Sequence, residues 1–142
     1  MNLIIGISLM MLCLIFQSAL MVASIKFYMT RQGWLQSPKF LVRLSLISGV
    51  MMMLIGSNLI QTALWALLFY FLDEFANFNE AFYHSAVNFA TLGYGDFVMS
   101  QKNKLLGALE ALNGIVMVGV STSVLMWVLQ DTLKIMLSKE HR

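Results

Sequence analysis

Three long apolar stretches divide the chain, and each is long enough to cross a membrane as a helix. Residues 3–25 and residues 44–72 carry no charged side chain, and residues 105–130 are apolar apart from Glu110. A hydrocarbon core needs about 20 helical residues to span it, and isolated strands cannot satisfy their backbone groups in lipid. The pattern therefore predicts three transmembrane helices, the second of which tilts or extends past the membrane surface because it exceeds the required length.

The composition agrees with a membrane environment and excludes several classes of function. Hydrophobic residues make up 59% of the 142 positions and charged residues only 11%, against about 25% in soluble domains. A net charge of +2 without a basic cluster argues against a nucleic-acid partner. Paired carboxylates, a nucleophile with its base and metal-ligand spacing are all missing, so no enzyme is predicted. The single cysteine, Cys13, cannot form an intrachain disulfide and is interpreted as a small apolar residue.

The first apolar stretch is predicted to be a retained helix rather than a signal peptide. No Lys or Arg precedes it, it is too long for an apolar signal core, and no small-residue cleavage site follows. The charges then set the orientation. Basic residues gather in the first connection and at the C-terminus, namely Lys26, Arg31, Lys39, Arg43, Lys134, Lys139 and Arg142. The positive-inside rule places both segments in the cytoplasm and the N-terminus outside.

The remaining connection, residues 73–104, is then external and is rich in acidic residues: Asp73, Glu74, Glu80 and Asp96. Its residues 78–90 are predicted to form a helix that is too short to cross the bilayer and so re-enters from the outer side. The chain continues as Thr-Leu-Gly-Tyr-Gly-Asp at 91–96. Irregular backbone at membrane depth is tolerated only where protein buries it or where it lines a water-filled path. Rings of backbone carbonyls can replace the hydration shell of a cation, and Gly93 and Gly95 permit the backbone angles that this requires.

Residues 91–96 resemble the selectivity filter of potassium channels. The order of helix, short helix, filter and helix over residues 44–130 resembles the two-helix pore domain of small prokaryotic members, here with one extra N-terminal helix. The resemblance implies an all-α integral membrane protein with three transmembrane helices, a re-entrant pore helix and an extended filter, assembled as a homotetramer in the inner (plasma) membrane. Its parts are expected as an N-terminal helix (1–30), an interfacial connection (31–43) and a pore domain (44–137) with outer helix 44–72, pore helix 78–90, filter 91–96 and inner helix 104–133.

The family resemblance also implies the ion sites. The carbonyls of Thr91, Leu92, Gly93 and Tyr94 are expected to bind K⁺, with Gly95 completing the filter. Bound K⁺ ions are the only expected cofactor, and lipids and an unidentified regulatory protein are the expected partners besides the other subunits.

The scaffold behind this filter departs from the family pattern, because Tyr83, His84, Val87 and Ala90 replace residues that usually brace it. Filter support is expected from Asp96, His84, Tyr83, Asn88 and Glu110. His84 either contacts Tyr94, responds to external pH or packs as an ordinary core residue.

The third apolar stretch resembles the inner helix of the same channels. Gly114 lies about 20 residues beyond the filter, at a position where such channels bend to open, and glycine permits a kink. The alternative is close helix packing through a small residue, and Gly119 is a competing hinge. Glu110 is expected to brace the pore helix through Asn88, His84 or a neighbouring subunit. Asn113 shares that network or faces the central cavity, and Thr122 lines the cavity.

Two other functions remain open from the sequence. The altered filter scaffold is compatible with a weakly selective cation channel, and a non-conducting accessory membrane subunit could keep a pore-like fold. No helix carries arginines at three-residue spacing, so a voltage sensor of the usual kind is not predicted. The basic and aromatic residues of 26–43 form either a membrane anchor or a gating lever.

Overall fold

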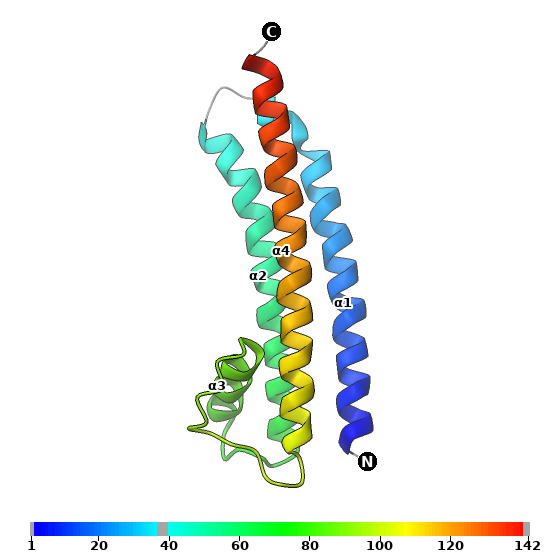
Figure 1. Ribbon diagram of the computed structural model, residues 1–142, viewed down its shortest axis with the longest axis vertical. Helices are drawn as coiled ribbons and strands as arrows, with labels where there is room; N and C mark the ends of the chain where they lie inside the picture. The colour runs from blue at the N-terminus through cyan, green and yellow to red at the C-terminus, as the bar shows by residue number, and fades with distance from the viewer. Residues whose placement is uncertain (1, 37–39, 141–142) are drawn as a thin grey trace. The chain divides into compact units, whose positions relative to one another are not determined.

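The computed structural model describes residues 2–36 and 40–140, and its regular elements are helices throughout that part of the chain. The elements are α1 (Asn2–Thr30), the 3₁₀-helix η1 (Gln32–Gln36), α2 (Phe40–Phe71), α3 (Phe78–Phe89) and α4 (Lys104–Glu140) (Figure 1). Two basic residues used for the predicted orientation, Lys39 and Arg142, lie outside the described residues. The predicted all-α class is confirmed.

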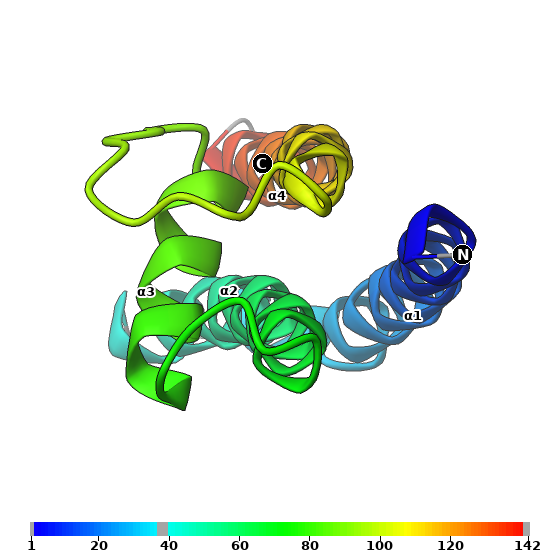
Figure 2. The ribbon, with the colours of Figure 1, turned by 90° about the horizontal axis from the view of Figure 1, so that it is seen from below.

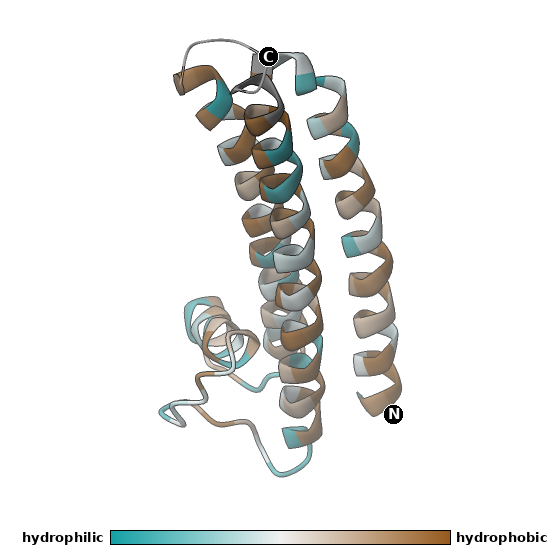
Figure 3. Cartoon of the chain, turned by 45° about the horizontal axis from the view of Figure 1, so that its top comes forward, coloured by the Kyte–Doolittle hydropathy of each residue, from teal (hydrophilic) through white to brown (hydrophobic). Residues whose placement is uncertain are grey.

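The long helices α1, α2 and α4 are each long and apolar enough to cross a membrane. Many of their large apolar side chains are exposed, including Ile4 and Ile15 at 69% and Met52 and Phe71 at 75%. Apolar residues dominate the colouring of these helices in Figure 3. Exposed apolar surface on this scale needs lipid or protein to cover it. The protein is therefore an integral membrane protein.

Two of the helices run beyond the apolar stretches that predicted them. α2 begins at Phe40, so Arg43 lies in its first turn, and α4 continues to Glu140 rather than ending near 133. Helical hydrogen bonding does not stop where hydrophobicity stops, because a helix can extend past the hydrocarbon into the interface. Hydropathy alone therefore places the start of α2 too late and the end of α4 too early.

The chain divides into two units, and each long helix contributes a segment to both. Unit 1 contains residues 1–17 and 58–118, which include all of α3. Seen from below in Figure 2, α3 lies beside the end of α2 and the start of α4. The core of unit 1 is built from Cys13 of α1, Trp65 and Phe69 of α2, and Phe89, Leu106 and Met117 around α3 and α4. Gly6 lets α1 approach α4 closely, because an added Cβ would lie 2.5 Å from the Leu106 side chain.

Unit 2 contains residues 18–57 and 119–142 and has its own core. Its fully or almost fully buried apolar residues are Tyr28, Leu35, Leu46, Val50, Leu54, Val124 and Val128. These positions come from α1, η1, α2 and α4. Each unit therefore joins α1 to the other two long helices.

Candidate functional site

The short helix α3 begins at a side-chain cap. The Asn77 side-chain oxygen accepts a hydrogen bond from the Glu80 backbone N–H at 2.9 Å, and its amide donates to the Glu80 carboxylate at 2.9 Å. The first bond satisfies one backbone donor that the first turn leaves unpaired, and the second joins the two side chains. With 12 residues, α3 is about 18 Å long, which is shorter than the hydrocarbon core.

The far end of α3 is closed by the first residues of segment 91–96. The Thr91 N–H donates to the Asn88 carbonyl at 2.9 Å, and the Leu92 N–H donates to the Val87 carbonyl at 2.9 Å. These two bonds form the Schellman arrangement, which requires a left-handed residue at Thr91. Thr91 has φ = 60°, a region that β-branched residues strongly disfavour. The segment therefore starts from a strained residue that is pinned to the helix end.

Beyond Thr91 the backbone turns through two glycines. Gly93 has φ = 58° and Gly95 has φ = 76°, angles that glycine adopts without a steric penalty. The side chains between and beside them are largely exposed, Leu92 at 56% and Tyr94 at 66%. The segment thus presents backbone groups held by α3 together with apolar and aromatic side chains that are more than half exposed.

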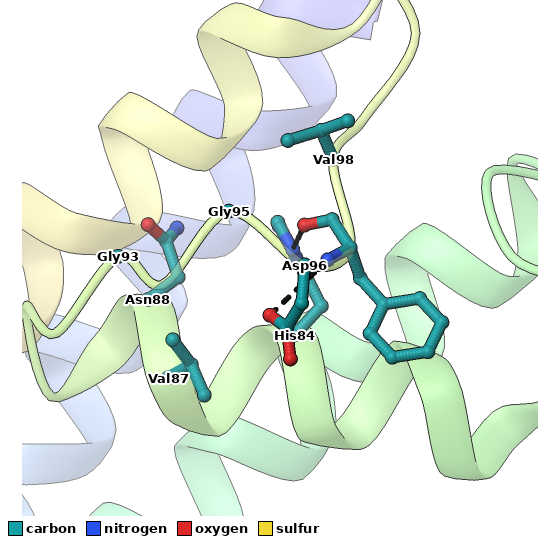
Figure 4. Close-up of a pocket in the computed structure, with 8 residues that line it drawn as sticks. His84, Val87, Asn88, Gly93, Gly95, Asp96 and Val98 are labelled. Atoms are coloured by element: carbon teal, nitrogen blue, oxygen red, sulfur yellow. Dashed lines mark hydrogen bonds between the residues drawn. The ribbon is translucent and has the colours of Figure 1, made fainter.

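A cavity of about 180 Å³ lies between α3 and this segment (Figure 4). It is lined by His84, Val87, Asn88, Gly93, Gly95, Asp96, Phe97 and Val98. The His84 Nδ1 lies 2.9 Å from the Phe97 carbonyl oxygen and therefore donates to it. The imidazole also packs on Phe75, with ring centroids 4.9 Å apart. Of the three alternatives for His84, the packing one agrees with these contacts, and the ring also holds the chain just after segment 91–96.

Two further residues that were expected to support segment 91–96, Tyr83 and Asp96, contact each other. The Tyr83 hydroxyl hydrogen-bonds the Asp96 carboxylate, and this bond raises the pKa of Tyr83. Asp96 also accepts from the Phe97 backbone N–H at 3.2 Å. Tyr83 and Phe97 stack edge to face at 5.7 Å. Tyr83, His84 and Asp96 thus form a cluster that ties α3 to the chain just beyond Gly95.

Glu110 of α4 is fully buried and faces α3. The Asn88 amide donates to its carboxyl at 2.8 Å and to the Gly107 carbonyl at 2.6 Å. The Ser85 hydroxyl lies between Glu110 and the Thr62 carbonyl of α2, which is 2.8 Å away. The expected partner Asn88 is present and the alternative His84 is not. Sequence reasoning missed Ser85 and Thr62, although Ser85 lies one turn before Asn88 on the same face of α3.

Gly114 meets the end of α3 directly. A Cβ at this position would lie 2.9 Å from the Phe89 carbonyl carbon and closer still to its oxygen. Only a residue without a side chain allows α4 to approach the α3 backbone so closely. An added Cβ at Gly119, by contrast, would meet nothing within 4 Å. The packing interpretation of Gly114 therefore has a structural basis, while Gly119 is sterically unrestricted.

The cavity assignment of Asn113 needs correction. Its side chain is fully buried inside unit 1, beside Cys13 of α1. Residues three and four apart share a helix face, so Asn113 and Gly114 lie on the same buried side of α4 as Glu110. A side chain enclosed within unit 1 is not open to a water-filled cavity. Thr122 is exposed.

A second carboxylate network lies on the segment that leads from residue 96 into α4. The Glu74 carboxylate accepts from the Ser100 N–H and the Ser100 hydroxyl, both at 2.7 Å, and from the Asn103 amide. The Asn2 amide donates to Asn103 at 2.7 Å. Partial burial raises the pKa of Glu74, but the hydrogen bonds from Ser100 and Asn103 outweigh it, so the pKa is lowered. The sequence identified Glu74 only as an external charge.

Comparison with known proteins assigns the family. Residues 58–131, just over half of the chain, match the family model described as ion channel. The match covers the last 14 residues of α2, all of α3, segment 91–96 and the first three-quarters of α4. Comparison with the curated proteins and with the solved structures finds no match. The short capped helix, the glycine-bearing segment and the buried carboxyl that braces them all fall within the matched region, and the chain belongs to the ion channel family.

Proposed function

We propose that the chain assembles as a homotetramer that conducts K⁺ selectively and passively across the membrane. The observation that carries this proposal is the backbone of residues 91–96. Two glycines in the left-handed region follow a helix end to which the chain is pinned by paired hydrogen bonds. Such a backbone can turn successive carbonyls toward one axis, where they replace the hydration shell of a cation.

The exposed side chains of the same segment support assembly. Leu92, Tyr94 and Val98 are 56%, 66% and 73% exposed, although they follow a helix that the membrane surrounds. Aromatic and large apolar side chains are enriched at the cores of protein interfaces. Neighbouring copies of the chain would bury these side chains, and fourfold symmetry would close each ring of carbonyls.

In this assembly, Thr91, Leu92, Gly93 and Tyr94 supply the carbonyl oxygens that bind K⁺, and Gly95 allows the exit from the filter. Tyr83, His84, Asn88, Asp96 and Glu110 support the filter from α3 and α4. The filter end of α4 faces the outside, so the acidic residues of segment 73–104 raise the local cation concentration at the entrance.

Ion-replacement recordings on the purified, reconstituted protein test the proposal. A tetramer should appear in nanodiscs, and the reversal potential should follow the potassium gradient and ignore sodium. Gly93→Ala should abolish the flux and leave the tetramer intact, because φ at residue 93 disfavours any Cβ. Gly33→Ala is the matched control, since an added Cβ there meets nothing within 4 Å. Undiminished flux in Gly93→Ala would show that the ion path lies elsewhere, and absent flux without a tetramer would favour the accessory subunit.

A weakly selective cation channel is the second candidate, and the contact of His84 favours it. This side chain binds the Phe97 carbonyl rather than Tyr94, so the ring that flanks the ion sites lacks that anchor. A softer filter discriminates less between ions of different size. Equal sodium and potassium permeability in the same recordings would support this candidate over strict selectivity.

A further inference from the structure

The extra N-terminal helix makes a specific polar contact with α4 inside unit 2. The Tyr28 hydroxyl donates to Asp131 Oδ2 at 2.9 Å, and the Gln32 amide donates to the same oxygen at 2.8 Å. The Tyr28 hydroxyl also lies 3.1 Å from the Thr132 hydroxyl. Two donors from α1 and η1 thus converge on one carboxylate oxygen of α4. We call Tyr28, Gln32, Asp131 and Thr132 the latch.

Packing around the latch fixes the position of its tyrosine. Tyr28 is fully buried, and its ring meets Trp127 edge to face at 5.6 Å. Leu35 of η1 and Val128 of α4 belong to the same buried cluster. A buried ring has few alternative rotamers, so its hydroxyl cannot follow Asp131 if α4 moves. Hydrogen bonds weaken steeply beyond normal length, and a displacement of about 1 Å breaks both contacts.

The latch lies far along α4 from the filter segment. From Lys104 to Asp131 the helix is continuous, which corresponds to a rise of about 40 Å. A hydrocarbon core is only about 30 Å thick, so this stretch of α4 is long enough to cross it. The helix is continuous through Gly119, where it passes from unit 1 to unit 2.

We propose that α1 and η1 hold this end of α4 in place through the latch and thereby keep the pore closed. The proposal rests on the proposed function, since it takes α4 as the helix that lines the pore and the latched position of this end of α4 as the closed one. Opening moves the end of α4 and separates Asp131 from Tyr28 and Gln32. The extra helix then acts as a built-in regulator of the pore.

Single-channel recording of Tyr28→Phe tests the latch, because this change removes the hydroxyl and keeps the ring. The ratio of open to closed time should rise about fivefold, which corresponds to about 1 kcal/mol for one lost hydrogen bond. Unitary conductance and reversal potential should not change, since the filter is untouched. Tyr70→Phe is the matched control: Tyr70 is an exposed tyrosine of α2 whose hydroxyl is not part of the latch.

Gln32 provides a second pair of variants that spares the buried core. Gln32→Ala should raise the open time as Tyr28→Phe does, and it serves where Tyr28→Phe fails to fold. Gln32→Lys places a positive charge beside Asp131 and should lower the open time. In an Asp131→Asn background the lysine has no carboxylate to bind, so its effect should vanish. An unspecific effect of the added charge would persist in that background and would overturn the proposal.

The possible outcomes distinguish a failure of the latch proposal from a failure of the proposed channel function. If the parent protein does not conduct, the proposed function is wrong, and the role of the latch in gating falls with it. If it conducts and all latch variants match Tyr70→Phe, the latch has no role in gating and the proposal is wrong. Opposite signs, with less opening in Tyr28→Phe and more in Gln32→Lys, would also overturn it, because the latch would then hold the open pore.

Discussion

At the residue scale, the hydrogen-bond partners of Glu110 restrict which side chains can replace it. Its carboxyl must accept from Asn88 and meet a Ser85 hydroxyl that also reaches the Thr62 carbonyl. A glutamine has an oxygen for Asn88 and an amide donor for Ser85, which leaves the Ser85 hydrogen for Thr62. Glu110→Gln should therefore retain tetramer stability and flux. Glu110→Ala should lose about 1–3 kcal/mol, because it leaves buried donors unpaired.

Thermal denaturation of the reconstituted protein, read together with potassium flux, distinguishes the two Glu110 variants. If the glutamine and alanine variants lose the same stability, the hydrogen bonds of Glu110 do not support the filter.

The second prediction at this scale concerns pH at Glu74. Hydrogen bonds from Ser100 and Asn103 outweigh the effect of burial and lower the pKa from its ordinary value of 4.5. A lowered pKa in the folded state means that the network contributes stability above pH 4.5 and loses it as the pH falls through the folded value. The segment that enters α4 should therefore be fully held at neutral pH and loosen only in stronger acid.

The ¹³C shift of the Glu74 carboxyl, followed against pH in nanodiscs, measures this value directly. Ser100→Ala removes the hydroxyl donor and keeps the backbone donor, so the titration midpoint should rise. A midpoint that stays the same in Ser100→Ala would contradict the assigned cause.

At the scale of the element, α4 carries two glycines with opposite surroundings. Gly114 lies against the Phe89 backbone, while Gly119 has open space around it, and α4 passes from unit 1 to unit 2 between Val118 and Gly119. Gly114→Ala should destabilise the tetramer by about 1–3 kcal/mol, because the backbone of α3 must shift. Gly119→Ala should be neutral or stabilising by about 1 kcal/mol, because alanine favours the helix.

Single-channel recordings of Gly114→Ala and Gly119→Ala then identify which glycine is the hinge. A hinge at Gly119 predicts that Gly119→Ala folds normally and opens less often. Normal opening in Gly119→Ala would leave Gly114 as the remaining hinge position.

The same helix shows which parts of the structure are accessible from sequence. The three spans follow from run length and hydrophobicity, which need no knowledge of neighbours. The partners of Glu110 depend on how α2, α3 and α4 are aligned, so Ser85 and Thr62 were not predictable from spacing alone. The burial of Asn113 was accessible, since a residue three positions after Glu110 lies on the same helix face. The latch could not be predicted from the sequence, because Tyr28 and Asp131 are brought together only by packing.

At the scale of the whole molecule, the orientation in the membrane decides where the filter faces. Within the described residues, Lys102 and Lys104 flank the start of α4, whereas Lys26, Arg31, Arg43 and Lys134 lie near the other ends of the long helices. The positive-inside rule places the larger basic group in the cytoplasm. The proposed orientation puts the proposed filter, segment 91–96, and its acidic surroundings outside, where they would attract cations before these enter the proposed pore.

Labelling of intact cells with a membrane-impermeant maleimide tests this orientation. The native Cys13 is fully buried, so the parent protein should stay unlabelled and serves as the control. Lys102→Cys should label from outside, and Lys134→Cys should label only after the membrane is permeabilised. The reverse pattern would place the filter at the cytoplasmic face, where the acidic segment would collect outgoing rather than incoming K⁺. The charge distribution of the chain would then oppose its insertion, contrary to the rule on which the orientation is based.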